Sequence, residues 1–166
     1  MSALILDAGA LVAVDRDDRA MIARLRVAQR GGLELRSNAM VVAQVWRDRR
    51  GRQVSLARVL QAVDVRAVSQ ADGRYAGILL AEAGTADPID ATVALLAAPG
   101  DRILTSDPGD LARLTAAAQS RAVIVPVNHC DRTAGGRSGC SPGARRCINI
   151  RSADWVTATA AQRNGP

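Results

Sequence analysis

The sequence predicts an α/β fold in which a central parallel sheet lies between two layers of helices. Along residues 3–127, short strand-like segments alternate with helix-like segments, as in chains that build a parallel sheet. The first of these segments is a continuous apolar run that ends at Asp7, which suits a strand that is covered on both faces. The chain has no Phe, one Tyr and two Trp. Its core must therefore be aliphatic, which favours helices on a sheet over an aromatic-rich β-sandwich.

The first predicted strand lies at the start of the stretch Ser2–Val14, SALILDAGALVAV, and it runs directly into Asp7. Open α/β sheets bind their ligands in a crevice at the carboxyl ends of the strands. We therefore interpret Asp7 as the anchor of a functional site. The alternative is that Asp7 only caps a following helix, since Asp is a common N-cap residue.

The remaining elements follow from apolar periodicity and from residues that begin or end helices. Ser37 or Asn38 is expected to begin a helix, and Gly31, Gly32 and Gly84 are expected to end helices. Further strands are predicted at Leu33–Arg36, Val63–Val68, Arg102–Thr105 and Ala122–Val127. Helices are predicted at Asp17–Arg30, Ala39–Arg49, Ser55–Ala62 and Asp72–Ala83, after Asp87-Pro88-Ile89-Asp90, and at Leu111–Ala118.

The pattern changes at Asn128, which sets the predicted domain boundary. Residues 1–127 form one domain, and residues 128–166 form an Arg/Gly/Ser-rich C-terminal appendage that we expect to be mostly disordered. Residues 1–127 hold 16 Arg against 14 acidic residues, and residues 128–166 hold 6 Arg against 2. Most of the net charge of +6 therefore belongs to the appendage.

The appendage also holds the one histidine of the chain, His129, and all three cysteines, Cys130, Cys140 and Cys147. Their spacing matches no zinc-site pattern, and we expect reduced thiols. We find no signal peptide and no segment that could span a membrane, so we expect a cytoplasmic protein without a membrane partner.

Two D-P-x-D motifs, at residues 87–90 and 107–110, each begin a predicted helix. Either motif alone is an ordinary helix start, with Asp as the cap and Pro in the first turn. The case for a site comes from three acids considered together. Asp7 and Asp107 each follow a predicted strand, and Asp90 lies on the first turn of the helix that precedes the second of these strands. The carboxyl ends of parallel strands lie at the same end of a sheet. We therefore expect these three carboxylates to converge, with Asp87 and Asp110 as auxiliary candidates.

Converged carboxylates repel one another and stay ionised together only around a cation. A site of oxygen ligands favours Mg²⁺ or Mn²⁺ over zinc, and such a site can activate water for phosphodiester hydrolysis. The sequence contains neither a P-loop nor a G-x-G-x-x-G fingerprint. An Asp-rich phosphotransferase is a further alternative, but Asp7 lacks the second nearby Asp that such enzymes usually display.

The ordered segments LILDAGALVAV, NAMVVAQVWRD, GTADPIDATVALLA, RILTSDPGDLARL and VIVPV resemble a PIN domain. The resemblance is to the toxin ribonucleases of bacterial VapBC toxin–antitoxin pairs, the VapC family, and it covers about residues 3–127. It implies a three-layer α/β/α PIN-like fold and a Mg²⁺-dependent endoribonuclease with Asp7, Asp90 and Asp107 as metal ligands. It also implies an RNA substrate, a cognate antitoxin that covers the site, and a homodimer.

The chain departs from the PIN pattern at Gln44, where the family has Glu. We expect Gln44 to point toward the covered face of its helix and to act as a weak ligand or to bind a metal-bound water. Asp48 is either a partial substitute for the missing carboxylate or a solvated residue. The alternative function is therefore a degenerate PIN domain that binds RNA or antitoxin without efficient cleavage.

Basic residues follow Gln44 at the predicted end of the same helix. This cluster, Arg47, Arg49, Arg50 and Arg52, is a candidate surface for the RNA backbone. The alternative is a solvated helix end, because cations are favoured near a helix C-terminus.

Overall fold

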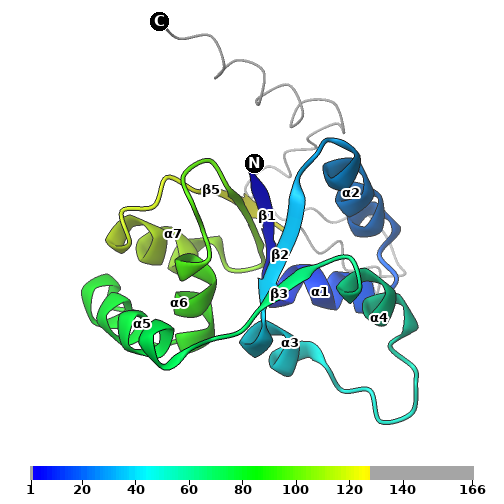
Figure 1. Ribbon diagram of the computed structural model, residues 1–166, viewed down its shortest axis with the longest axis horizontal. Coiled ribbons are helices and arrows are strands. Elements are labelled where there is room, and N and C mark those ends of the chain that lie inside the picture. The colour runs from blue at the N-terminus through cyan, green and yellow to red at the C-terminus, as the bar shows by residue number, and fades with distance from the viewer. Residues whose placement is uncertain (1, 128–166) are drawn as a thin grey trace, which may run out of the picture. The chain divides into compact units, whose positions relative to one another are not determined.

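The computed structural model describes residues 2–127, and these form a five-stranded, wholly parallel sheet between two layers of helices (Figure 1). The strand order is β3-β2-β1-β4-β5. The strands are β1 (Ala3–Leu6), β2 (Glu34–Asn38), β3 (Asp64–Arg66), β4 (Arg102–Thr105) and β5 (Val123–Pro126). In the centre of the sheet, Ile5 of β1 is in register with Arg36 of β2 and Ile103 of β4. The predicted α/β fold with a parallel sheet is confirmed.

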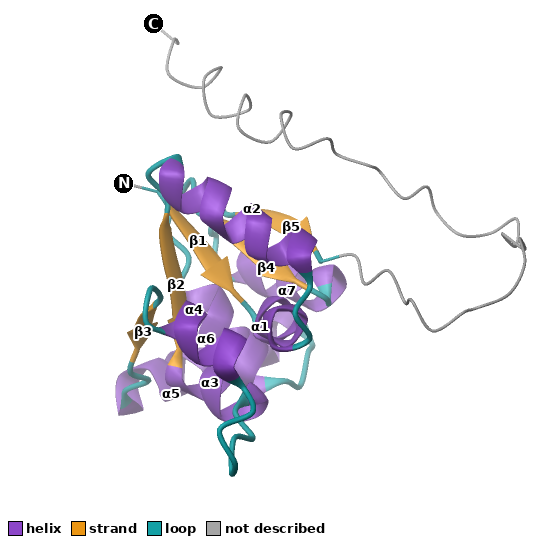
Figure 2. Cartoon of the chain, turned by 90° about the vertical axis from the view of Figure 1, so that its right-hand side faces the viewer, coloured by secondary structure: helices purple, strands orange, loops and turns teal. Residues whose placement is uncertain are grey.

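Within residues 2–127, seven helices cover the two faces and the carboxyl end of the sheet. They are α1 (Ala8–Asp15), α2 (Arg19–Arg30), α3 (Ala39–Val45), α4 (Val54–Leu60), α5 (Gln70–Ala83), α6 (Pro88–Leu95) and α7 (Pro108–Ala117). One layer contains α1, α2 and α4, and the other contains α5, α6 and α7. Figure 2 looks onto the first of these layers. Helix α3 lies at the carboxyl end of the sheet and contacts both α1 and α6.

The core is centred on β1, whose four residues are all buried. Leu4, Ile5 and Leu6 are at most 1% exposed, as are Ile103 and Leu104 on the neighbouring strand. Each such side chain contributes about 1.5–3 kcal/mol by leaving water. This explains why an uninterrupted apolar run precedes Asp7, since both faces of β1 are covered by helices.

The opposite end of the sheet is closed by a buried acid with a structural role. Asp101 is 2% exposed; its Oδ1 accepts a hydrogen bond from Ala3 N at 2.7 Å and its Oδ2 accepts one from Ala98 N at 3.0 Å. Arg36 Nη1 lies 3.8 Å from Asp101 Oδ2. Asp101 thereby joins the starts of β1 and β4.

Most predicted elements are found within a few residues of their expected bounds, but one helix is shorter than predicted. Helix α3 ends at Val45 and not at Arg49, because Trp46 has an extended backbone with φ −73° and ψ 116°. The arginines that follow therefore belong to a loop. The predicted appendage, with its cysteines and His129, lies outside the described residues. None of the helices within residues 2–127 is long and apolar enough to cross a membrane.

Candidate active site at the carboxyl end of the sheet

Asp7 is a buried acid and a helix cap at the same time. It follows β1, is 4% exposed and is the N-cap of α1. Its Oδ1 accepts a hydrogen bond from Ala8 N at 2.6 Å, and its Oδ2 accepts one from the Thr105 hydroxyl at 2.8 Å. The capping interpretation of Asp7 is confirmed, and Asp7 also lies at the carboxyl end of β1, because a parallel sheet brings a strand end and a helix start to the same point.

Thr105, which the sequence did not single out, links the ends of the two central strands. Its hydroxyl donates to Asp7 and accepts a hydrogen bond from Asp107 N at 2.9 Å. Thr105 is fully buried, and it lies 98 residues from Asp7 along the chain. The sequence did contain a signal for this linking role. Thr105 is a polar residue at the end of an apolar strand, two positions before Asp107.

A close approach between α1 and the loop after β4 brings the two acidic segments together. A Cβ atom added to Gly9 would lie 2.5 Å from Ser106 Oγ and 2.7 Å from Ser106 Cβ. Only glycine leaves room for Ser106 at that distance. Gly9 therefore allows the first turn of α1, which Asp7 caps, to lie against the segment that leads to Asp107.

Two of the other acids, Asp87 and Asp107, cap the starts of α6 and α7, as the capping interpretation predicted. Asp87 accepts hydrogen bonds from Ile89 N at 2.8 Å and Asp90 N at 3.4 Å, and Asp107 accepts one from Asp110 N at 3.4 Å. Asp110 forms an ion pair with Arg113. Asp90 has no capping role and is half-buried on the first turn of α6. Among the four, Asp90 is the acid whose position is not accounted for by local structure.

The pKa values indicate that these carboxylates share one electrostatic environment. The pKa of Asp90 is raised to about 7, first by burial and then by the charges of Asp7, Asp87, Asp107 and Asp110, in that order. Burial also raises the pKa of Asp7; the hydrogen bonds from Thr105 and Ala8 oppose this increase, and Asp87 and Asp107 add to it. Strongly perturbed acids that gather in this way are typical of functional sites.

The donor set suits a hard cation, although the carboxylates are not yet at ligand spacing. Carboxylate oxygens are the ligands that Mg²⁺ and Mn²⁺ prefer, and five Asp side chains influence one another here. Within residues 2–127, no three side chains of His, Cys, Asp or Glu already form a group that could hold a metal ion. Binding a cation would therefore require the carboxylates to move closer, which their mutual repulsion opposes when no cation is between them.

Buried polar residues fix the neighbouring helices at this edge. Ser37 Oγ donates to Leu6 O at 2.8 Å, and Asn38 Nδ2 donates to Thr92 Oγ1 at 3.0 Å. Asn38 Oδ1 also accepts from Val41 N at 3.0 Å and so caps α3. Thr92 lies two residues after Asp90, so this network ties the end of β2 to the acidic turn of α6.

Gln44 lies on an exposed part of α3, contrary to the expectation that it faces the covered side. The buried residues of α3 are Val41 and Val45, whereas Met40 and Gln44 are exposed. Met40, one turn before Gln44 on the same side of the helix, is 41% exposed. A neutral side chain at position 44 therefore lies on the open side of the helix.

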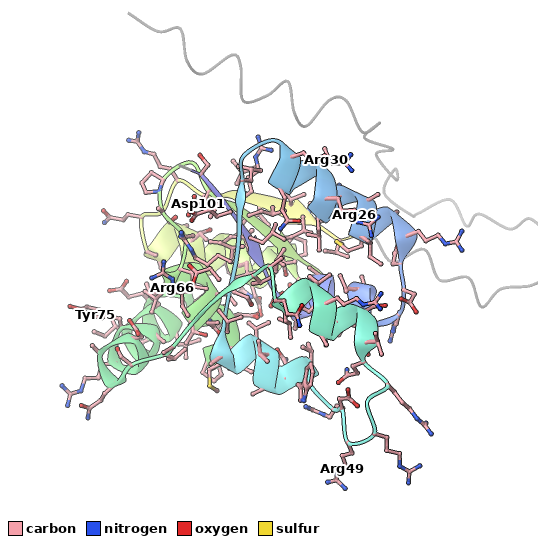
Figure 3. All side chains as sticks on the ribbon, turned by 45° about the vertical axis from the view of Figure 1, so that its right-hand side comes forward. Arg26, Arg30, Arg49, Arg66, Tyr75 and Asp101 are labelled. Atoms are coloured by element: carbon pink, nitrogen blue, oxygen red, sulfur yellow. The ribbon has the colours of Figure 1, made fainter. Side chains whose placement is uncertain are left out.

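The basic cluster forms a loop of residues 46–53, here called the arginine loop (Figure 3). Arg47 is used locally, because its Nη1 donates to Ala43 O and Trp46 O, both at 2.8 Å. Arg49, Arg50 and Arg52 are exposed. Asp48 neither joins the acidic group nor is merely solvated: its oxygens accept backbone hydrogen bonds within this loop.

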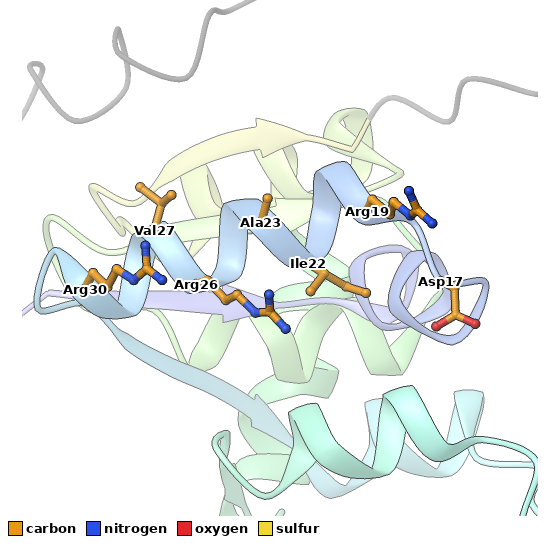
Figure 4. A pocket seen from close by; sticks show the side chains of 7 residues that line it. All are labelled: Asp17, Arg19, Ile22, Ala23, Arg26, Val27 and Arg30. Carbon is orange, nitrogen blue, oxygen red and sulfur yellow. The ribbon is translucent and has the colours of Figure 1, made fainter.

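A separate hollow of about 730 Å³ runs along α2 (Figure 4). Its lining includes Arg19, Ile22, Arg26 and Arg30, and it contains none of the predicted site carboxylates. The acidic site at the sheet edge is therefore defined by charge and hydrogen bonding, and not by this hollow.

Comparison with known proteins supports the architecture. No protein-family model and no curated protein matches the chain. The crystal structure of VapBC2 from Rickettsia felis, bound to a DNA fragment from their promoter, contains a chain of similar fold, with a TM-score of 0.58 and 13% sequence identity. The match covers 76% of this chain and 99% of that chain. This similarity shows a PIN-like α/β fold for the matched part.

Proposed function

We propose that this protein is a metal-dependent endoribonuclease that acts as the toxin of a type II toxin–antitoxin pair. The observation that carries the proposal is that burial and the charges of Asp7, Asp87, Asp107 and Asp110 raise the pKa of Asp90 to about 7 at the carboxyl end of a parallel sheet. The PIN-like fold and the motifs of the sequence support the same conclusion.

In this proposal Asp7, Asp90 and Asp107 hold Mg²⁺ or Mn²⁺. The cation would activate water and neutralise charge on the phosphate that is attacked. Thr105 holds the Asp7 carboxylate in place by its hydrogen bond and ties it to the segment of Asp107. Asp87 caps α6, Asp110 lies in the first turn of α7, and both add negative charge to the site.

The proposed partners follow from the same class of protein. RNA is the substrate, and the exposed Arg49 and Arg50, with Arg47 at the end of α3, are the proposed contacts to its backbone. A cognate antitoxin covers the site, the toxin forms a homodimer, and both proteins work in the cytoplasm. The antitoxin proposal is supported by the similarity to a chain of the VapBC2 complex.

One observation favours a second candidate, a PIN domain that binds RNA or antitoxin but cuts inefficiently. Gln44 supplies no charge where the family has Glu, and its side chain is exposed. Each carboxylate adds Coulombic attraction for a divalent cation in a partly desolvated cleft. The loss of one charge should therefore weaken both metal binding and the orientation of the attacking water.

The deciding experiment is single-turnover cleavage of a structured RNA across a Mn²⁺ titration, with EDTA as the zero-metal point. We expect metal-dependent cleavage that Asp7→Asn reduces by about 100-fold or more. Asp15→Asn, at the exposed end of α1, is the matched control and should leave the rate unchanged. Gln44→Glu should lower the Mn²⁺ midpoint and raise the rate.

The outcomes separate the two candidates. If the natural chain cuts RNA as fast as the Gln44→Glu variant, Gln44 is no defect and the degenerate-domain candidate is wrong. Cleavage that appears only in Gln44→Glu supports the degenerate domain. If neither protein cuts RNA at any Mn²⁺ concentration, the nuclease proposal is wrong.

A further inference from the structure

Trp46 is a partly exposed aromatic residue whose backbone is held on both sides. It is 39% exposed, in a chain with one Tyr and two Trp. The backbone N–H of Trp46 donates to Val42 O at 2.8 Å. The side chain of Gln53 spans the residue, because Gln53 Nε2 donates to Val45 O at 3.2 Å and Gln53 Oε1 accepts from Arg47 N at 2.7 Å. Gln53 is itself buried, so the position of Trp46 at the end of α3 is fixed.

The rest of the arginine loop is built around the Asp48 carboxylate. Asp48 Oδ1 accepts from Arg50 N at 3.1 Å and Arg52 N at 2.9 Å, and Oδ2 accepts from Gln53 N at 3.3 Å. These hydrogen bonds hold the pKa of Asp48 below its usual value, and the one from Arg52 has the largest effect. Gly51 has φ +66°, which most other residues avoid, and so completes the turn.

The arginine side chains of this loop are left available. Arg49, Arg50 and Arg52 are exposed, and within residues 2–127 no ion pair joins them to an acid. The Asp48 carboxylate is occupied by backbone N–H groups and does not bind a guanidinium. The loop therefore has a defined backbone and carries three exposed arginines within six residues of the partly exposed Trp46; Figure 3 labels one of them, Arg49.

We propose that Trp46 and the arginine loop form a binding platform for single-stranded RNA. An unpaired base stacks on the Trp46 ring, and Arg49, Arg50 and Arg52 contact the adjacent phosphates. Stacking on an aromatic ring together with a basic track is how proteins bind single strands without reading sequence, and guanidinium groups match phosphate geometry. Acidic side chains alone would pair with the arginines but would make no use of the exposed face of Trp46, which an unpaired base does use.

The platform is connected to the acidic site by α3. That helix has seven residues, so it spans about 10 Å. Its first turn is tied through Asn38 to Thr92, two residues from Asp90. A strand seated on Trp46 can thus follow the exposed side of α3, past Gln44, toward the carboxylates. Only the path of the strand toward the carboxylates rests on the proposed nuclease function, because binding of RNA to the platform requires no cleavage.

The test measures binding in EDTA, where no metal-dependent cleavage occurs, so that failure of the nuclease proposal does not affect it. In the full chain carrying Trp155→Phe, Trp46 is the sole tryptophan. Its fluorescence should be quenched in a saturable way by a single-stranded oligouridylate and much less by a blunt RNA duplex, whose bases are already stacked.

Affinity is then measured by anisotropy of the same oligouridylate carrying a fluorescein label. We expect Trp46→Ala to weaken binding about tenfold, as for loss of one stacked base, and Trp46→Tyr to restore most of it. Tyr75→Ala, which removes an aromatic residue 62% exposed on α5, is the matched control and should have no effect. Arg49→Gln should lower the slope of log K against log salt by about 0.7, the value for one phosphate contact on a single strand.

Three outcomes would contradict the proposal. The first is equal affinity of Trp46→Ala and Tyr75→Ala for the oligouridylate. The second is saturable RNA binding without quenching of Trp46. The third is poly-glutamate binding with the same affinity and the same Trp46 quenching, which would instead identify an acidic protein surface as the partner. Circular dichroism and the melting temperature of each variant establish that it is folded.

Discussion

The carboxyl end of the sheet and the arginine loop use aspartate in opposite ways. At the sheet edge, burial and neighbouring acids raise the pKa values of Asp7 and Asp90. In the loop, hydrogen bonds from backbone N–H groups lower the pKa of Asp48. At the sheet end the carboxylates repel one another, and a cation can relieve this repulsion; in the loop, backbone hydrogen bonds stabilise the carboxylate anion. An acidic residue is therefore a candidate for chemistry when its neighbours do not already stabilise its anion.

The same comparison distinguishes Asp7 from Asp101, since both are buried beside the central strand. Both oxygens of Asp101 accept backbone hydrogen bonds, one from Ala98 three residues earlier and one from Ala3 on β1. Asp7 accepts one backbone hydrogen bond from the residue that follows it and one from Thr105. The hydroxyl of Thr105 is therefore the contact that makes the environment of the Asp7 carboxylate depend on tertiary structure.

The largest expected effect follows from Thr105→Val, which removes the link between the two strand ends. The variant loses a hydrogen bond to a carboxylate and the acceptor for Asp107 N, and we expect a loss of about 3 kcal/mol in the free energy of unfolding. Urea unfolding at pH 7 measures this. Thr105→Ser should retain most of the stability. Thr115→Val, whose buried hydroxyl bonds only within α7, should cost much less, and an equal loss would contradict a special role for Thr105.

A somewhat smaller effect is expected from Gly9→Ala, which tests the close approach of α1 to Ser106. The added Cβ would meet Ser106 at 2.5–3.0 Å, and overpacking of this kind costs about 1–3 kcal/mol. Gly77→Ala, on α5 with no atom within 4 Å of the new Cβ, should instead stabilise the protein by about 0.5–1 kcal/mol. Thermal unfolding compares the two. Equal stability of both variants would show that Ser106 can move away without cost.

The repulsion at the sheet edge should appear as a pH dependence of the stability of the metal-free protein. The pKa of Asp90 is raised in the folded state, so the unfolded chain releases this proton first as pH rises. Stability should therefore fall between about pH 4 and pH 7 and then level off. Melting temperatures in EDTA from pH 5 to pH 8 measure this decrease, which Asp90→Asn should reduce and Asp15→Asn should not. Added Mn²⁺ should restore stability at pH 8 if the site binds it.

The smallest effect on global stability is expected from Asp48→Ala, because the arginine loop lies at the surface. The pKa of Asp48 is lowered, so its contribution is complete above its ordinary pKa and is lost only in acid. The melting temperature should change little and equally at pH 5 and pH 8. Hydrogen exchange should instead become faster at the amides of Arg50, Arg52 and Gln53, which donate to Asp48. Unchanged exchange at these amides would mean that the loop does not need Asp48.

Local sequence was sufficient for most of the secondary structure. The apolar run before Asp7 predicted β1 because a strand covered on both faces has no polar alternation. The two D-P-x-D motifs predicted the starts of α6 and α7 because the cap and the proline act within one turn. The order of these elements also predicted the parallel sheet, since parallel strands require crossover connections.

Contacts between distant segments decided the rest. The hydroxyl that holds Asp7 comes from 98 residues away, and the depth of Asp90 depends on how α6 packs between α5 and α7. Helix α3 ends at Val45 because a buried Gln53 binds the backbone on both sides of Trp46, which the helical pattern through Arg49 did not indicate. The sequence by itself determined where the acids and arginines stand along the chain. Only tertiary packing decided which acids are left without compensating partners, because burial and hydrogen bonding are properties of neighbours in space.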